Sequence, residues 1–148
     1  MEPISATISS VMNRRFRNSM VLVASLASLV LLVACGGSGE RARDFEVVQF
    51  SGETFRLYQE TESQVVVVNF WYPSCPPCRA EMPAIEAAWQ ELKGEPVRIL
   101  GLYVPQGFDS EEDARDFVNE LGLTFSFATD RSARIAEAYD FDAFPKTY

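Results

Sequence analysis

Residues 65–72, VVVVNFWY, form an almost unbroken apolar run that leads directly into two cysteines three positions apart, Cys75 and Cys78. A run of β-branched and aromatic residues of this length predicts a central strand that is buried on both faces. After the cysteines, Met82, Ile85 and Trp89 are spaced like one apolar face of a helix. A buried strand that passes straight into an amphipathic helix indicates an α/β fold with a cysteine pair at the junction.

The rest of the chain continues to alternate strands with helices. Residues 97–104 predict a second buried strand, and a capping box after it, at Asp109 or Ser110, predicts the start of a further helix. The remaining predicted elements are a hairpin over 47–57, a short strand over 124–128, a helix over 132–139 and the opening of a strand at 147–148. This order predicts parallel βαβ units with right-handed crossovers.

Charge and histidine content exclude several classes of function. The chain has a formal net charge of −8. Residues 1–34 contain three arginines and one glutamate, so the remainder carries ten basic and twenty acidic side chains. This surface is unsuited to a phosphate backbone, so we expect no nucleic-acid partner. The chain has no histidine, which excludes histidine metal sites and Cys–His or Ser–His catalytic pairs.

The first residues have the pattern of a secretory signal. A basic cluster at 13–17 precedes fifteen mostly apolar residues, 20–34, which are too few for a comfortable membrane span of about 20 residues. The end of this segment, LVAC, resembles a bacterial lipobox. The resemblance implies cleavage before Cys35 and lipidation of that cysteine. An uncleaved membrane anchor is the alternative, and Met12 could be the true start.

The predicted organisation therefore has three parts. Residues 1–34 are expected to be a lipoprotein signal peptide, 35–43 the lipidated cysteine with a flexible glycine-rich tether, and 44–148 the folded domain. A lipoprotein of this kind lies outside the cytoplasm, where disulfides are permitted.

Three interpretations of the Cys75–Cys78 pair compete. A closed zinc site needs four ligands, and only two cysteines share this neighbourhood. A purely structural disulfide across two intervening residues would contribute little stability. Thiol–disulfide exchange explains the spacing, because a helix N-terminus stabilises a thiolate at Cys75 and Cys78 lies one turn later. We therefore expect Cys75 to be the exposed nucleophile and Cys78 the more buried resolving thiol.

The segment VNFWYPSCPPCRAEMP resembles the active-site segment of thioredoxin-like proteins of the TlpA/ResA type. These are membrane-tethered thiol–disulfide oxidoreductases, several of which serve cytochrome c maturation. The resemblance covers 44–148 and implies a thioredoxin-like fold, with a central mixed sheet flanked by helices and a helix-plus-strand insert at 110–128. It also implies that Phe144 and Pro145 form the cis-proline loop that faces the cysteines.

The resemblance implies further site residues. Glu81 matches a glutamate that assists proton transfer at the cysteines, although a solvated surface charge is the alternative. Asn69 stands where ordinary thioredoxins have a buried aspartate, which would leave the acid–base task to Glu81. Pro145, Phe144 and Trp71 are the expected substrate-binding residues, with an extended substrate segment pairing beside the proline. An ordinary trans proline at 145 and a core position for the tryptophan are the alternatives.

The chain departs from the family pattern in two places. Ser74 precedes the first cysteine, where family members usually have tryptophan. This change removes an apolar screen and is expected either to expose Cys75 or to change which substrates fit. The C-terminal strand pair and helix of the fold are expected to be missing, because no sequence follows Tyr148. As a consequence, we expect an unpaired edge on the strand at 65–72 and one bare face of the sheet, as in a fragment of a longer reading frame.

Pro76 and Pro77, between the cysteines, have no backbone N–H to solvate a thiolate. This predicts a reductant, or a disulfide exchanger that favours neither oxidation nor reduction strongly. The reduction potential of the cysteine pair should lie well below the value of about −120 mV of DsbA.

The sequence thus predicts a lipid-anchored, extracytoplasmic oxidoreductase of the thioredoxin-like class, with protein disulfides as substrates, an apocytochrome c among the candidates. We expect a membrane electron donor and no organic cofactor or metal. The alternatives are a redox-silent lipoprotein that binds a partner and a peroxide-reducing relative. A copper-delivery role is disfavoured by the absent histidine and the cysteine spacing.

Overall fold

The computed structural model describes residues 41–148. The predicted signal segment, Cys35 and most of the tether lie outside the described residues. Within 41–148, no helix combines the length and the apolar character that a membrane crossing requires.

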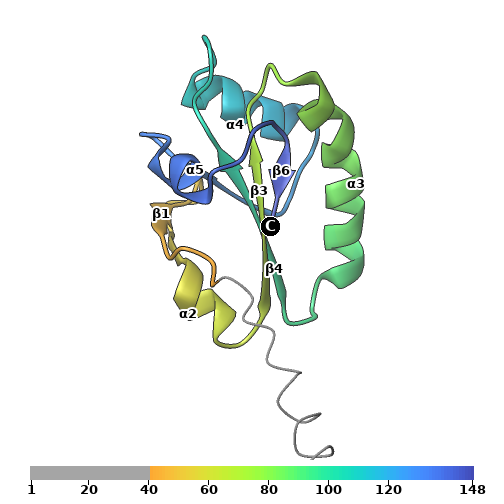
Figure 1. Cartoon of the computed structure of the whole chain (residues 1–148). Helices are drawn as coiled ribbons and strands as arrows, with labels where there is room; N and C mark the ends of the chain where they lie inside the picture. The colour runs from red at the N-terminus through yellow and green to blue at the C-terminus, as the bar shows by residue number, and fades with distance from the viewer. Residues whose placement is uncertain (1–40) are drawn as a thin grey trace, which may run out of the picture. The chain divides into compact units, whose positions relative to one another are not determined.

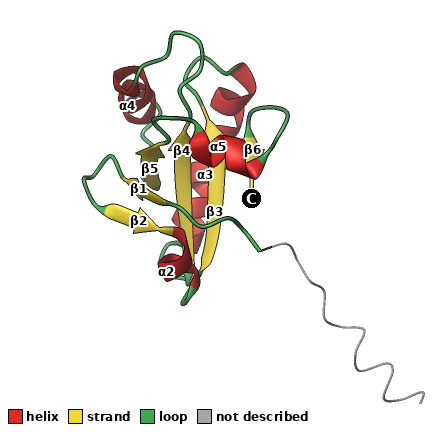
Figure 2. Ribbon diagram, turned by 60° about the vertical axis from the view of Figure 1, so that its left-hand side comes forward, coloured by secondary structure: helices red, strands yellow, loops and turns green. Residues whose placement is uncertain are grey.

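Four strands form the central sheet in the order β5-β4-β3-β6. The strands β3 (Val65–Trp71), β4 (Val97–Tyr103) and β5 (Ser126–Thr129) run parallel, and β6 (Lys146–Thr147) runs antiparallel to β3. Figure 2 shows this order across the sheet. The predicted mixed α/β sheet is confirmed. Its strand bounds differ from the expected ones by one or two residues at most.

Helices α3 (Pro76–Leu92) and α4 (Glu111–Glu120) supply side chains to the buried cluster on one face of the sheet. This cluster is rich in aromatic rings, and the ring centroids of Trp71 and Phe117 lie 4.8 Å apart. Helix α4 begins with the predicted capping box, in which the Ser110 hydroxyl accepts from Asp113 N and the Asp113 carboxylate accepts from Ser110 N. The helix-plus-strand insert therefore packs as an integral part of this face.

The opposite face is covered by the predicted hairpin and two short helices. The hairpin pairs β1 (Glu46–Val48) with β2 (Thr54–Arg56), α2 (Leu57–Thr61) follows it, and α5 spans Arg134–Tyr139. Phe70 of β3 packs here against the rings of Tyr139 and Phe141, at 5.3 and 5.0 Å. Figure 1 shows α3 on one side of β3 and β4, and α2 and α5 on the other.

Two expectations about the sheet are wrong. The edge of β3 is paired, because Asn69 lies opposite Thr147 and Phe70 opposite Lys146. Tyr148 and Val68 exchange two backbone hydrogen bonds of 3.0 Å. The face expected to be bare is covered, since the hairpin, α2 and α5 supply it with apolar side chains. Backbone N–H and C=O groups that are left unpaired cost free energy. This favours the pairing of even a two-residue strand with the edge of β3.

Two elements differ in detail from the prediction. Helix α5 starts at Arg134 rather than Ser132, because Ala133 has a left-handed backbone with φ of 55°. Helix α2 was not predicted, since five residues are too few to show helical periodicity.

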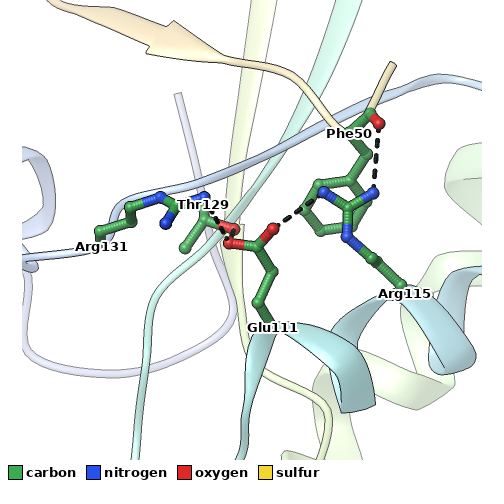
Figure 3. A network of polar contacts seen from close by, with 5 residues as sticks. All are labelled: Phe50, Glu111, Arg115, Thr129 and Arg131. Atoms are coloured by element: carbon green, nitrogen blue, oxygen red, sulfur yellow. Dashed lines mark hydrogen bonds and ion pairs between the residues drawn. The ribbon is translucent and has the colours of Figure 1, made fainter. Parts of the chain in front are cut away.

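A polar network joins α4 to the end of β5 and to the hairpin (Figure 3). Glu111 accepts hydrogen bonds from Arg115 at 2.8 Å and from Thr129 at 3.0 Å, and Arg131 lies 3.1 Å away. Arg115 also donates to the carbonyl of Phe50, after β1, and stacks over its ring at 4.2 Å. The network thus joins α4, the end of β5 and the hairpin.

Candidate active site

Cys75 occupies the N-cap of α3, at the point where the chain leaves β3 and turns into the helix. Its Sγ is bonded to Cys78 Sγ in a disulfide of 2.04 Å and accepts a hydrogen bond of 3.2 Å from Cys78 N. Pro76 and Pro77 fill the first two helical positions and have no N–H. Cys78 is therefore the first residue of the helix that can donate a backbone hydrogen bond to this sulfur.

Both cysteines are buried. Cys75 is 1% exposed and Cys78 is 0% exposed, and both belong to the buried cluster that contains Trp71 and Met82. The expectation that Cys75 would be the exposed cysteine, with Ser74 uncovering it, is wrong for this disulfide-bonded form. Cys75 belongs to the buried cluster to which α4 contributes Ala114 and Phe117, and the side chain of Ser74 donates to Asp109 instead of extending beside the sulfur.

Ser74 is tied to the loop that precedes α4. Its backbone N and its hydroxyl both donate to Asp109 Oδ2, at 2.9 and 2.7 Å. The carbonyl of Asp109 in turn accepts a hydrogen bond of 2.6 Å from the buried hydroxyl of Tyr103. Burial and the carboxylates of Asp109, Asp113 and Glu111 raise the pKa of Tyr103, so this hydroxyl stays protonated and remains a donor.

On the side of β6, Glu81 contacts the interior of the sheet. Its Oε1 accepts a hydrogen bond of 2.7 Å from the side-chain amide of Asn69, which is fully buried on β3. The same amide nitrogen donates to Thr147 Oγ1 at 3.0 Å, and Asn69 Oδ1 has no hydrogen-bond partner. Glu81 is therefore half-buried and oriented toward the sheet, so the alternative of a freely solvated charge does not describe it.

The expected cis-proline loop is present. The Phe144–Pro145 peptide bond is cis, so the alternative of a trans proline does not hold. The ring of Phe144 contacts the ring of Tyr72 edge-on at 5.2 Å, and the carbonyl of Tyr72 accepts a hydrogen bond from Cys75 N at 3.2 Å. The structure thus places Phe144 and Pro145 beside the segment that leads into the cysteine pair.

Trp71 does not line the surface. It has no exposed area and packs against the rings of Phe117, Tyr103 and Phe127. Its assignment as a substrate-binding residue is corrected to a core residue. The end of β3 is covered by α4, so an aromatic side chain there is enclosed.

A hollow of about 290 Å³ opens beside Ser74 and Arg79. Arg79 lies over the ring of Phe117 at 4.7 Å and pairs with Glu120 at 3.1 Å. The other charged groups that line the hollow are Asp109, Asp113 and Asp116. Four carboxylates and one guanidinium give this side of the site a negative potential. Among residues 41–148, no cluster of three or more cysteine, aspartate or glutamate side chains is arranged to hold a metal ion.

Sequence reasoning missed the role of Asp109 and of Thr147. The sequence pattern indicates Asp109 only as a possible cap for α4, a position that Ser110 occupies in the structure. Its partner Ser74 is 35 residues away, and no local pattern connects the two.

The fold and the disulfide at the β3–α3 junction define a thioredoxin-like protein. The model of the AhpC/TSA family matches residues 38–148, and the chain belongs to this family. Within it, the similarities confirm the resemblance to the TlpA/ResA type.

Two curated relatives are named thiol-disulfide oxidoreductase ResA. The protein from Halalkalibacterium halodurans is 33% identical over 110 residues, which cover 74% of this chain and 60% of that protein. The protein from Oceanobacillus iheyensis is 30% identical over 145 residues, covering 90% of this chain and 73% of the relative.

A solved structure, the thioredoxin domain of a thiol-disulfide oxidoreductase from Bacteroides vulgatus, superposes with a TM-score of 0.66 at 21% identity. The match covers 74% of this chain and 77% of that one. At this identity, the likeness supports the fold. The chain spans about three fifths of the length of several curated relatives, so the activity of the whole protein is a proposal for this chain.

Proposed function

We propose that this protein is an extracytoplasmic thiol–disulfide oxidoreductase that reduces or exchanges disulfides in other proteins. The observation that carries the proposal is the Cys75–Cys78 disulfide at the N-cap of α3, with Cys78 N donating to Cys75 Sγ at 3.2 Å. A sulfur in this position gains from the helix dipole and from one backbone donor when it becomes a thiolate.

The reaction proceeds in two exchanges once the pair is reduced. The Cys75 thiolate attacks one sulfur of a substrate disulfide, forms a mixed disulfide and releases the other substrate sulfur as a thiolate. The Cys78 thiolate then attacks Cys75 Sγ, breaks the mixed disulfide and releases the second substrate thiolate. Two electrons pass to the substrate, and Cys75 and Cys78 end in a disulfide. A dithiol donor must reduce this disulfide before the next turnover.

Glu81 is the proposed acceptor of the proton that Cys78 loses. It lies three residues after Cys78 on α3, and its hydrogen bond to the buried Asn69 holds its carboxylate on the inner side of the helix. A carboxylate kept in this position can take up and return a proton without leaving the site.

Phe144 and Pro145 are the proposed contact for the substrate backbone. They lie beside Tyr72 at the start of the cysteine segment, where an extended peptide can add to the site by backbone pairing. An apocytochrome c with a cysteine pair and a membrane-bound dithiol donor are the partners we propose.

Reduction of insulin with dithiothreitol as electron donor tests the activity. We expect the wild type to accelerate precipitation of the insulin chains and Cys75→Ser to lose the acceleration completely. Cys78→Ser should instead accumulate a mixed disulfide with the substrate, visible in a non-reducing gel. Cys35→Ser is the matched control, because it removes the only cysteine outside the pair. Equal rates for wild type and Cys75→Ser would refute the proposal.

The burial of both sulfurs favours one competing function, a redox-silent module that binds a partner. In that case the disulfide only holds the turn, and the insulin assay would give equal rates for all variants. A peroxide-reducing function would instead show consumption of hydrogen peroxide that depends on Cys75.

Lipid anchoring at Cys35, after a signal peptide over 1–34, is proposed from the sequence alone and places the domain on the outer face of the membrane. Intact mass measurement of protein extracted from membranes tests it. We expect a mass that fits cleavage before Cys35 plus acyl chains, and loss of membrane association in Cys35→Ser. An unmodified full-length mass would contradict the assignment.

A further inference from the structure

The carboxylate of Asp109 holds the residue that directly precedes Cys75. Its Oδ2 accepts from both Ser74 N and Ser74 Oγ, at 2.9 and 2.7 Å. Hydrogen bonds to an ionised acceptor are about twice as strong as neutral ones. Two of them on one residue fix both the backbone and the side chain of Ser74.

Asp109 is itself anchored in the core. Its carbonyl accepts from Tyr103 Oη at 2.6 Å, and Tyr103 is 1% exposed. The ring of Tyr103 lies 5.9 Å from that of Trp71, the last residue of β3. The Ser74–Asp109–Tyr103 chain thus connects the turn before the cysteines to the ends of both central strands.

We infer that Asp109 is a positioning residue for Cys75, which acts by holding Ser74 through hydrogen bonds. The inference rests on the proposed function only in that Cys75 is taken to be the nucleophile. Cys75 Sγ is stabilised as a thiolate if it stays over the N-terminus of α3, and the backbone before it is held by Asp109. Without the hydrogen bonds from Ser74 to Asp109, the sulfur of Cys75 moves away from the Cys78 N–H, which is the first backbone donor of α3.

The negative charge of Asp109 and its hydrogen bonds to Ser74 have opposite effects on the Cys75 thiolate, so substitutions can separate them. A negative carboxylate near the sulfur disfavours the thiolate, whereas the hydrogen-bonded hold favours it. Asp109→Asn removes the charge but keeps an acceptor oxygen for Ser74, and Asp109→Ala removes both. Asp116→Asn is the matched control, because Asp116 lines the same hollow and its carboxylate accepts no hydrogen bond within residues 41–148.

The test measures the rate at which iodoacetamide alkylates Cys75 in the reduced full-length protein, as a function of pH, with the labelled peptide resolved by mass spectrometry. At pH 7 we expect Asp109→Ala to react about tenfold more slowly than Asp109→Asn, with its rate profile displaced to higher pH. Asp116→Asn should react as fast as the wild type or slightly faster. Equal rates for Asp109→Ala and Asp109→Asn would overturn the inference.

A second pair of variants guards against loss of folding in Asp109→Ala. Ser74 lies on the surface, so Ser74→Ala and Ser74→Thr should both fold, and thermal unfolding by circular dichroism checks this. We expect Ser74→Ala, which loses the hydroxyl donor, to slow alkylation of Cys75 about threefold, and Ser74→Thr to keep the wild-type rate. Identical rates for the two would overturn the inference. Alkylation needs no protein substrate, so a failed insulin assay in the wild type would refute the proposed function without deciding this result.

Discussion

Asn69 and Glu81 are joined by a hydrogen bond of 2.7 Å between the amide nitrogen in the middle of the sheet and a carboxylate oxygen on the helix that carries the cysteines. Asn69 is fully buried, and its amide oxygen has no hydrogen-bond partner. The amide donates to the carboxylate without carrying a charge of its own. The only titratable group in this pair is therefore Glu81, which supports its assignment to proton transfer.

Glu81→Gln is expected to slow reduction of insulin about tenfold or more at pH 7, because it removes the proposed proton acceptor and keeps the shape and the oxygen that faces Asn69. Glu91→Gln is the control, since Glu91 lies on the same helix, is exposed, and its carboxylate has no hydrogen bond or ion pair within residues 41–148. An equal loss in both variants would mean that net charge, rather than the Glu81 carboxylate, is responsible.

Pro77→Ala is expected to raise the reduction potential of the cysteine pair. It restores a backbone N–H at the second position of α3, where Cys78 N is the first available donor to Cys75 Sγ. A further donor stabilises the thiolate of the reduced form, and a gain of about 1.4 kcal/mol corresponds to a rise of about 30 mV. Equilibration with glutathione redox buffers measures the potential.

Pro83→Ala is the control for this substitution, because Pro83 lies six residues further along the same helix and is exposed. Its potential should equal that of the wild type. If the reduction potential of Pro77→Ala is at or below the wild-type value, then the backbone N–H groups that the prolines lack do not determine this potential.

The elements that carry the site are predictable from local pattern. The apolar run of β3, the spacing of apolar residues on α3 and the Ser110–Asp113 capping box each depend on residues a few positions apart. The cysteine pair is equally local. Physical rules that act within one or two turns therefore lead to the β3–α3 junction without any tertiary information.

What could not be predicted depends on residues that are far apart in sequence. The burial of Cys75 and Trp71 results from packing of α4, some forty residues later, over the end of β3. The pairing of β6 with β3 and the Ser74–Asp109 hydrogen bonds join segments 35 or more residues apart. Several arrangements of such segments satisfy the same local patterns, and tertiary packing selects among them.

Gly101→Ala is expected to destabilise the domain by about 1–3 kcal/mol. A Cβ at this position of β4 would overlap the ring of Phe127, and Phe127 is confined by the rings of Trp71 and Phe125. Urea unfolding measures the change. In a double-mutant cycle, Phe127→Leu should recover part of the loss because it vacates the space that the methyl group needs. If the destabilising effects of the two substitutions are additive, the loss of stability does not come from contact between the added methyl group and the Phe127 ring.

Glu111→Gln tests the network that holds α4 (Figure 3). The hydrogen bond from Arg115, with help from Thr129 and Arg131, lowers the pKa of Glu111 in the folded protein, although partial burial acts in the opposite direction. A lowered folded-state pKa means that the carboxylate stabilises the fold above its unfolded pKa of about 4.3. This contribution is lost as the pH falls through the folded-state value.

We therefore expect Glu111→Gln to lower the free energy of unfolding by about 0.5–1 kcal/mol at pH 7, the range for partly exposed ion pairs. The difference from the wild type should vanish in the acid range, below the lowered pKa. Glu112→Gln is the control, because Glu112 carries the same charge in the same helical turn but its carboxylate has no hydrogen bond or ion pair within residues 41–148. This variant therefore reports the helix-dipole contribution alone. If both variants lose the same stability at pH 7, the dipole rather than the contacts with Arg115, Thr129 and Arg131 accounts for the effect of Glu111.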